Sequence, residues 1–233
     1  MMSDPVAAVR QPSSPARFGP PLAMGAVAIV SAVLTGFVAH AHGPTRADAD
    51  GLRWMVDHRN GALTIAAKLA SIAGDTVTLA LIAALACAVL AWRHRWRQAA
   101  LVAATTGGAA VSVVAGKHLI GRARPPMVYH LVAETNQSYP SGHSLGSTAV
   151  FGVLAAVVLV DVHRRALRWW VVGAAVCAVA AIGVSRLYLG VHWPTDIVAG
   201  WLFGGLWLMV CLFAYHALTQ RYSREFSPGL RAR

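Results

Sequence analysis

The chain has 233 residues, of which 57% are hydrophobic and only 12% are charged, and its mean hydropathy is +0.55. About a quarter of the residues in soluble domains are charged, so this composition excludes an ordinary soluble protein and indicates membrane helices. The net charge of +11 does not indicate nucleic-acid binding, because the arginines form short clusters between apolar runs, which is a membrane-topology pattern.

Six apolar runs predict an all-α, polytopic bundle of six transmembrane helices. The runs cover roughly residues 21–40, 72–92, 99–116, 144–160, 169–184 and 195–216. Residues 39–41 resemble a signal-peptidase site, but the first run is longer than a signal-peptide core of about 7–15 residues, which favours an uncleaved helix. We therefore divide the chain into a disordered cytoplasmic tail (1–21), a six-helix membrane domain (22–218) and a second cytoplasmic tail (219–233).

Residues 44–70 carry too many charges for a membrane span, although apolar side chains recur among them. This mixture predicts an amphipathic helix in the membrane interface, whose function the sequence does not reveal. Asp75 lies near the start of the second run and is predicted to cap that helix. Cys87, Cys177 and Cys211 lie in apolar runs and show neither a disulfide framework nor a zinc spacing.

The basic residues are divided unequally between the two ends of the predicted bundle. The termini and the turns at 93–97 and 161–168 contain twelve Lys and Arg against three acidic residues, a net charge of +9. The opposite end contains eight Lys and Arg against six acidic residues, a net charge of +2. The positive-inside rule therefore predicts a multi-pass protein of the cell membrane with both termini in the cytoplasm.

Polar residues converge at the opposite, outer face. The helix ends predicted to lie there carry Lys117, Arg122, Arg124, Ser141, His143, Ser185, Arg186, His192 and Asp196. A single basic residue at a helix end is usually an anchor at the lipid surface. The conjunction of complementary groups on one face, where ionisable residues are costly, instead favours a functional site.

The cationic members of this set are suited to bind a phosphoryl group. Lys117, Arg124 and Arg186 offer positive charge and several N–H donors, and guanidinium groups bind phosphate oxygens bidentately. The Pro-Ser-Gly-His segment at 140–143 begins the fourth helix. Although such a turn is also an ordinary helix start, its free backbone N–H groups and the Ser141 hydroxyl could bind an anion.

Two histidines and a carboxylate add candidate catalytic groups. Asp196 follows His192 by four residues and could accept one ring N–H, leaving the other nitrogen free to attack phosphorus. His143 lies beside the cationic groups and could protonate a leaving oxygen. Zinc binding by His192 and Asp196 is disfavoured, because neither a cysteine nor an HExxH-like pair accompanies them, so no metal or other cofactor is predicted.

Three segments together resemble the signature of the type 2 phosphatidic acid phosphatase (PAP2) family, which is related to vanadium haloperoxidases. Residues 117–125 match K-x6-R-P, residues 140–143 match P-S-G-H, and residues 185–196 match S-R-x5-H-x3-D. The signature covers residues 117–196, and the six-helix plan extends the resemblance over roughly residues 22–218. One of these motifs would be weak evidence, whereas three complete motifs in order are highly specific.

The resemblance implies a role for each matching residue. His192 would form a phosphohistidine, Asp196 would orient it, and His143 would act as general acid on the leaving group. The phosphate would be held by Lys117, Arg124, Ser141, Gly142 and Arg186. Membrane members of the family need no metal. Arg122 lies outside the strict pattern, and the sequence leaves open whether it contacts substrate or only the lipid head-group layer.

The resemblance implies a lipid phosphatase but leaves its substrate open. Family members at the outer face act on phosphatidic acid, phosphatidylglycerol phosphate or polyprenyl diphosphates such as undecaprenyl diphosphate. A phosphotransferase, in which an alcohol intercepts the phosphohistidine, would use the same residues. A lipid-phosphate carrier is disfavoured because it would not need His143 and Asp196, and a soluble haloperoxidase is disfavoured by the membrane runs. The oligomeric state is not determined.

Overall fold

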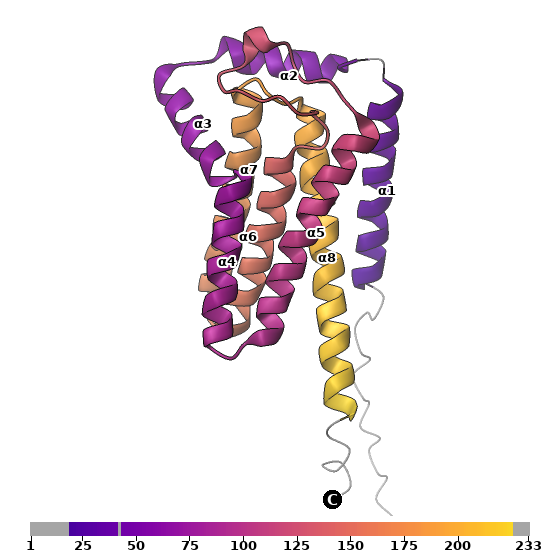
Figure 1. Cartoon of the computed structure of the whole chain (residues 1–233), viewed down its shortest axis with the longest axis vertical. Helices are drawn as coiled ribbons and strands as arrows, with labels where there is room; N and C mark the ends of the chain where they lie inside the picture. Colours follow the sequence, from indigo (N-terminus) through magenta and orange to yellow (C-terminus); the bar gives the residue numbers. More distant parts are fainter. Residues whose placement is uncertain (1–18, 42, 226–233) are drawn as a thin grey trace, which may run out of the picture.

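The computed structural model describes residues 19–41 and 43–225, and this part of the chain consists of helices joined by loops, without strands. Its elements are α1 (Gly19–His40), α2 (Arg46–Asp57), α3 (Gly61–Ala73), α4 (Thr76–Trp92), α5 (Trp96–Ile120), the 3-10 turn η1 (Met127–Tyr129), α6 (Gly142–Asp161), α7 (Arg165–Tyr188) and α8 (Pro194–Glu225). The predicted all-α class is confirmed (Figure 1). The predicted tails fall largely outside the described residues, although α1 begins within the first and α8 continues into the second.

Five helices are long and apolar enough to cross a membrane, namely α1, α5, α6, α7 and α8. A sixth crossing is formed if α3 and α4 count as one span, since together they meet the same criteria but are bent by 50°. The polytopic six-helix plan is therefore confirmed, with one broken span. The bend lies at Gly74 and Asp75, where the Asp75 carboxylate accepts the Val77 N–H at 2.9 Å and caps α4 as predicted.

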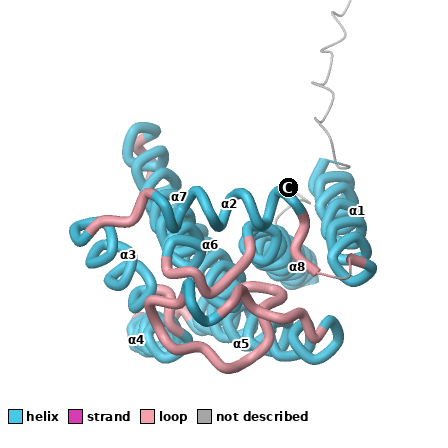
Figure 2. The backbone as a smooth tube through the Cα atoms, turned by 90° about the horizontal axis from the view of Figure 1, so that it is seen from above, coloured by secondary structure: helices cyan, strands magenta, loops and turns pink. Residues whose placement is uncertain are grey.

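The segment at 44–70 differs from the single interfacial helix that was predicted. It is divided into α2, which lies across one end of the bundle, and α3, which leads into α4 (Figures 1 and 2). Each part has its own start signal: Thr45 and Asp48 form a capping box for α2, and the Asn60 side chain caps α3. Caps, rather than hydrophobic periodicity, therefore divide this segment.

Helix α6 is the centre of the bundle and contacts α4, α5, α7 and α8, whereas α1 packs mainly against α8. Glycines allow the close approach of these helices: a Cβ atom at Gly152 would lie 2.3 Å from Leu208 Cδ2, and one at Gly183 would lie 2.5 Å from Trp201 Cζ2. This up-and-down arrangement brings the end of α5, the start of α6, the end of α7 and the start of α8 to the same end of the bundle, beneath α2 (Figures 1 and 2).

Candidate active site

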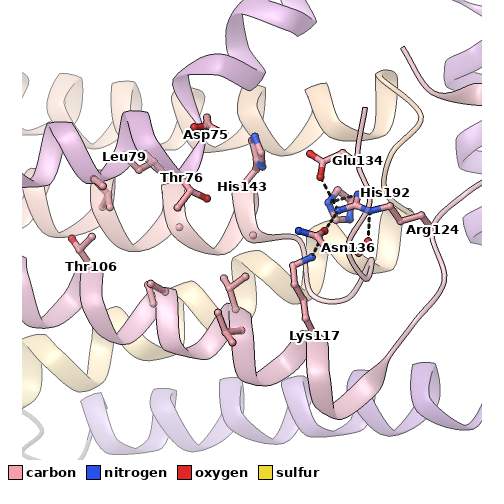
Figure 3. Close-up of a pocket in the computed structure, with 18 residues that line it drawn as sticks. Asp75, Thr76, Leu79, Thr106, Lys117, Arg124, Glu134, Asn136, His143 and His192 are labelled. Atoms are coloured by element: carbon pink, nitrogen blue, oxygen red, sulfur yellow. Dashed lines mark hydrogen bonds and ion pairs between the residues drawn. The ribbon is translucent and has the colours of Figure 1, made fainter. Parts of the chain in front are cut away.

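A cavity of about 410 Å³ lies between α4, α5 and α6 at this end of the bundle (Figure 3). Its deeper walls are apolar and include Leu79, Ala109, Val113, Val114 and Val150. Its polar end is lined by Lys117, Arg124, Glu134, Asn136, His143 and His192. The cavity therefore joins a charged end to a long apolar wall.

The three predicted cations approach this region from different elements. Lys117 ends α5 and donates to Asn136 Oδ1 at 3.1 Å, while Arg124 in the following loop donates to the carbonyl of Val191 at 2.6 Å. Arg186, near the end of α7, lines an adjoining cavity of about 380 Å³ and donates to Ser71 Oγ at 2.5 Å. Its Nε is buried and has no hydrogen-bond partner among residues 19–41 and 43–225.

Glu134 lies between the two arginines, and sequence reasoning missed it. Its Oε2 pairs with Arg124 Nη2 at 3.2 Å, and its Oε1 pairs with Arg186 Nη2. Glu134 and His143 line both cavities. The Glu134 carboxylate therefore lies between the cavity that Arg124 lines and the cavity that Arg186 lines. The only sequence signal was an acidic residue within the polar 117–143 stretch, which does not reveal a position in space.

His192 and Asp196 form a buried pair just before and at the start of α8. His192 Nδ1 lies 3.3 Å from Asp196 Oδ2, and this carboxylate oxygen also accepts the Trp193 N–H at 2.9 Å and the Ser138 hydroxyl. An ionised carboxylate only accepts, so Nδ1 carries the proton and Nε2 keeps its lone pair. Nε2 lies 3.2 Å from Arg124 Nη1, on the side of the cavity.

The protonation state of His192 is set mainly by its burial. The side chain is 1% exposed, and burial lowers its pKa to about 4, although the hydrogen bond and charge of Asp196 oppose this decrease and Arg124 and Arg186 add to it. The ring is therefore neutral at pH 7. A neutral ring with Nδ1 bound to a carboxylate is the form that a nitrogen nucleophile requires.

Of the motif residues at the start of α6, two line the cavity and Ser141 does not. Gly142 and His143 line the cavity, and Figure 3 shows the His143 ring in the same pocket as His192. Ser141 is fully buried and does not line the cavity; its hydroxyl accepts the Ser144 N–H at 3.4 Å and caps α6. Ser185 likewise donates to the carbonyl of Ile182 at 2.7 Å, away from both cavities.

Arg122 takes a position that neither alternative from the sequence anticipated. Its side chain is 8% exposed and pairs with Asp48 at 2.7 Å and Asp196 at 2.5 Å, so it is a buried link and not a head-group anchor. Among residues 19–41 and 43–225, no group of three or more His, Cys, Asp or Glu side chains is arranged to hold a metal ion.

The fold and this pocket define a polytopic helical membrane protein with paired histidine and carboxylate groups beside a cluster of cations. The chain belongs to the PAP2 superfamily, whose family model matches residues 97–220. Its fold is similar to that in the crystal structure of a transmembrane PAP2-type phosphatidylglycerolphosphate phosphatase from Bacillus subtilis, with a TM-score of 0.73 and 24% identity over 86% of this chain and 98% of that one.

Curated relatives include enzymes with different lipid substrates. An undecaprenyl-diphosphatase of Sulfolobus acidocaldarius is 37% identical over 30% of each chain, and phosphatidylglycerophosphatase B of Bacillus subtilis is 37% identical over 38% of this chain and 43% of its own. A decaprenylphosphoryl-5-phosphoribose phosphatase of Mycolicibacterium smegmatis is 33% identical over 61% of this chain and 73% of its own. The matches thus span less than half of the first two relatives.

Proposed function

We propose that this protein is a membrane lipid phosphatase, which hydrolyses a phosphomonoester or pyrophosphate bond of a lipid through a phosphohistidine. The observation that carries the proposal is the buried His192 ring, bound through Nδ1 to Asp196, with Nε2 beside Arg124 in a cavity that both residues line. Such an arrangement combines an oriented nucleophile with positive charge, the two requirements of covalent phosphoryl transfer.

The reaction would proceed in two balanced steps. In the first, His192 Nε2 forms a bond to the terminal phosphorus while the bond from that phosphorus to the leaving oxygen breaks, and His143 donates a proton to that oxygen. The leaving oxygen is the ester oxygen of a monophosphate or the bridging oxygen of a diphosphate. In the second, His143 takes a proton from water, whose oxygen attacks the phosphohistidine and releases inorganic phosphate and the free His192 ring. Asp196 holds Nδ1 throughout and balances the positive charge that the ring gains as it is phosphorylated.

The cavity walls support a lipid as the phosphate donor. The apolar lining along α4, α5 and α6 suits an acyl or prenyl chain, and the cations at its end suit the phosphate. The names of the relatives point to phosphatidylglycerol phosphate and polyprenyl-linked phosphates, and phosphatidic acid meets the same chemical criteria.

The membrane orientation belongs to the same proposal. The basic turns at 93–97 and 161–168 lie at the end of the bundle opposite the cavity, and the last turns of α8 extend in the same direction (Figure 1). The positive-inside rule then supports cytoplasmic termini and a site on the outer face. A substrate in the outer leaflet would reach the site from the lipid layer.

A phosphate-release panel tests the proposed activity. Purified protein in mixed micelles is offered phosphatidic acid, phosphatidylglycerol phosphate and undecaprenyl diphosphate, and inorganic phosphate is measured. We expect release from at least one of them, inhibition by vanadate as a phosphate analogue, and unchanged activity in EDTA, because the proposed steps use only side chains. Absence of release from all three lipids, or loss of activity in EDTA, would contradict the proposal.

Glu134 leads to a second prediction. Its carboxylate bridges Arg124 and Arg186 and must give way to a phosphate that binds the same guanidinium groups, because two anions there repel each other. We expect Glu134→Gln to lower the inhibition constant of inorganic phosphate by about tenfold, since like charges in contact cost more than 1 kcal/mol. Asp57→Asn, at the end of α2, is the control. An unchanged constant in the Glu134 variant would show that the carboxylate does not compete with phosphate.

A further inference from the structure

A buried polar network connects α2 to the start of α8 behind the cavity. Asp48 on α2 is fully buried, whereas Asp50, two residues further along, is exposed with Arg53. Asp48 Oδ1 accepts the backbone N–H of Thr195 at 3.0 Å and its hydroxyl at 2.9 Å. Asp48 Oδ2 accepts Arg122 Nη2 at 2.7 Å and the Thr45 N–H at 3.2 Å. This carboxylate therefore caps two helices and binds one cation.

Arg122 connects Asp48 to Asp196. Its Nη1 donates to Thr195 Oγ1 at 2.7 Å and to Asp196 Oδ1 at 2.5 Å, so the planar guanidinium bridges Asp48 and Asp196. The side chain is almost inaccessible, and its charge centre lies 5.9 Å from the Trp193 ring. A buried cation with two ionised partners is held in one orientation, because any rotation leaves a carboxylate unpaired.

The two oxygens of Asp196 have separate partners as a result. Oδ1 binds Arg122, and Oδ2 binds His192 Nδ1, the Trp193 N–H and the Ser138 hydroxyl. The plane of the carboxylate is thus fixed from both sides. His192 Nδ1 is hydrogen-bonded to Oδ2, so the orientation of the ring depends on the orientation of the carboxylate. The direction of Nε2 therefore depends on the contact that Arg122 makes with Oδ1.

We propose that Asp48 and Arg122 are positioning residues, which hold Asp196 so that Nε2 of His192 is directed at the phosphorus atom. This inference rests on the proposed function, because it assigns the network to the same nucleophile. It makes α2 a part of the active site, although that helix contributes no residue to the lining of the cavity. The alternative is that the network only fastens α2 to the bundle, which would affect stability and not the chemical step.

Two single variants and one double variant of the full-length protein separate these alternatives. Asp48→Asn keeps the shape of the side chain but removes its charge, and Arg122→Lys keeps the charge but not the planar bridge. The native cluster of Asp48, Arg122 and Asp196 has a net charge of −1. The double variant D48N/R122Q removes one negative and one positive charge, so this net charge is unchanged. For each variant, kcat, KM, the inhibition constant of inorganic phosphate and the thermal unfolding midpoint in detergent are measured on monodisperse protein.

A positioning role predicts a specific loss of turnover. We expect kcat to fall about 10- to 100-fold in Asp48→Asn and Arg122→Lys, the scale of a small misplacement of a reacting group, with KM and the phosphate inhibition constant within about threefold. In the double variant, the unfolding midpoint should move back towards that of the wild type while kcat stays low. Asp50→Asn is the matched control on the same helix and should behave as the wild type.

Three outcomes would overturn the inference. The first is a kcat in both single variants within about threefold of the wild type, below the loss that misplacement causes. The second is a rate loss that disappears as the double variant regains stability. The third is a wild-type protein that releases phosphate from none of the three lipids, in which case the proposed function fails as well. An active wild type with equally active Asp48 and Arg122 variants overturns the positioning role alone.

Discussion

Replacing His192 by Ala is expected to lower phosphate release by about 10⁴-fold or more, the order by which loss of a covalent nucleophile lowers turnover in other hydrolases. Its Nε2 would form the bond to phosphorus, and among residues 19–41 and 43–225 no second nucleophile is held against Asp196 in the same way. Release of phosphate from the preferred lipid is the measurement, at saturating substrate and with equal amounts of folded protein.

His118→Ala is the matched control, since His118 is exposed near the end of α5, one residue after Lys117. It should retain wild-type turnover. A carrier of lipid phosphates would release no phosphate even as the wild type. Turnover by the wild type that is lost in His192→Ala while phosphate binding is retained therefore distinguishes the two hypotheses. Turnover by His192→Ala within tenfold of the wild type would rule out the histidine mechanism.

The second large effect is expected at Arg186. Arg186→Ala removes a buried guanidinium that pairs with Glu134 and lines the cavity adjoining that of His192, and kcat/KM should fall by about 10²- to 10³-fold, the usual effect of losing one donor to a developing phosphoryl charge. The loss should appear in vanadate inhibition too, because vanadate in its five-coordinate form resembles the transition state. Steady-state kinetics and vanadate titration of the same preparations provide the measurement.

Arg95 offers a control for the removal of an arginine. It lies in the turn between α4 and α5, a turn at the end of the bundle opposite α2 and the candidate site (Figure 1), and it pairs with Asp161 at 2.5 Å. Arg95→Ala should leave kcat/KM within about threefold of the wild type, since exposed ion pairs contribute about 0–1 kcal/mol to stability. An equal loss of activity in both variants would mean that positive charge in general, and not the Arg186 contact, supports turnover.

The acidic limb of the pH profile follows from the same site. The folded protein holds the pKa of His192 near 4, chiefly through burial, so the neutral nucleophile is lost only as the pH falls through about 4. The Asp196 carboxylate raises the pKa of the ring, and Asp196→Asn should therefore shift this limb of kcat/KM to lower pH while lowering the rate. A limb near 6.5 in the wild type would indicate a solvated ring, contrary to the structure.

Hydrophobicity and three motifs were enough to predict the membrane helices and most of the pocket. Runs of about 20 apolar residues have few alternatives to a membrane helix, so their number and order could be predicted before the structure. The broken span was missed because α3 has only 13 residues, too few to cross a membrane alone, and was grouped with the charged segment before it, although the capping residue Asn60 was visible in the sequence. The helix ends that carry Lys117, His143 and Asp196 followed from alternating helix direction.

The contacts that complete the site could not be predicted in this way. Asp48 meets Thr195, 147 residues later, and Glu134 meets Arg186, 52 residues later, so neither pairing has a periodicity that sequence reasoning can detect. Single acidic residues in polar segments are usually solvated and unpaired, and only the fold shows that these two pair with buried arginines. The Ser141 hydroxyl is a related case, because the motif suggests a ligand contact, whereas the structure shows this group as the cap of α6, and the contact stays a prediction.

The bend between α3 and α4 links the membrane crossing to the chemistry. At Gly74 a methyl group would lie 2.2 Å from Ile182 Cγ2, on a stiff β-branched side chain, and 3.3 Å from the His143 ring carbon Cδ2. The backbone at the bend therefore lies against the ring of His143, the proposed proton donor. A straight, continuous span would move this backbone, so the path of the chain through the membrane and the position of that imidazole depend on the same bend.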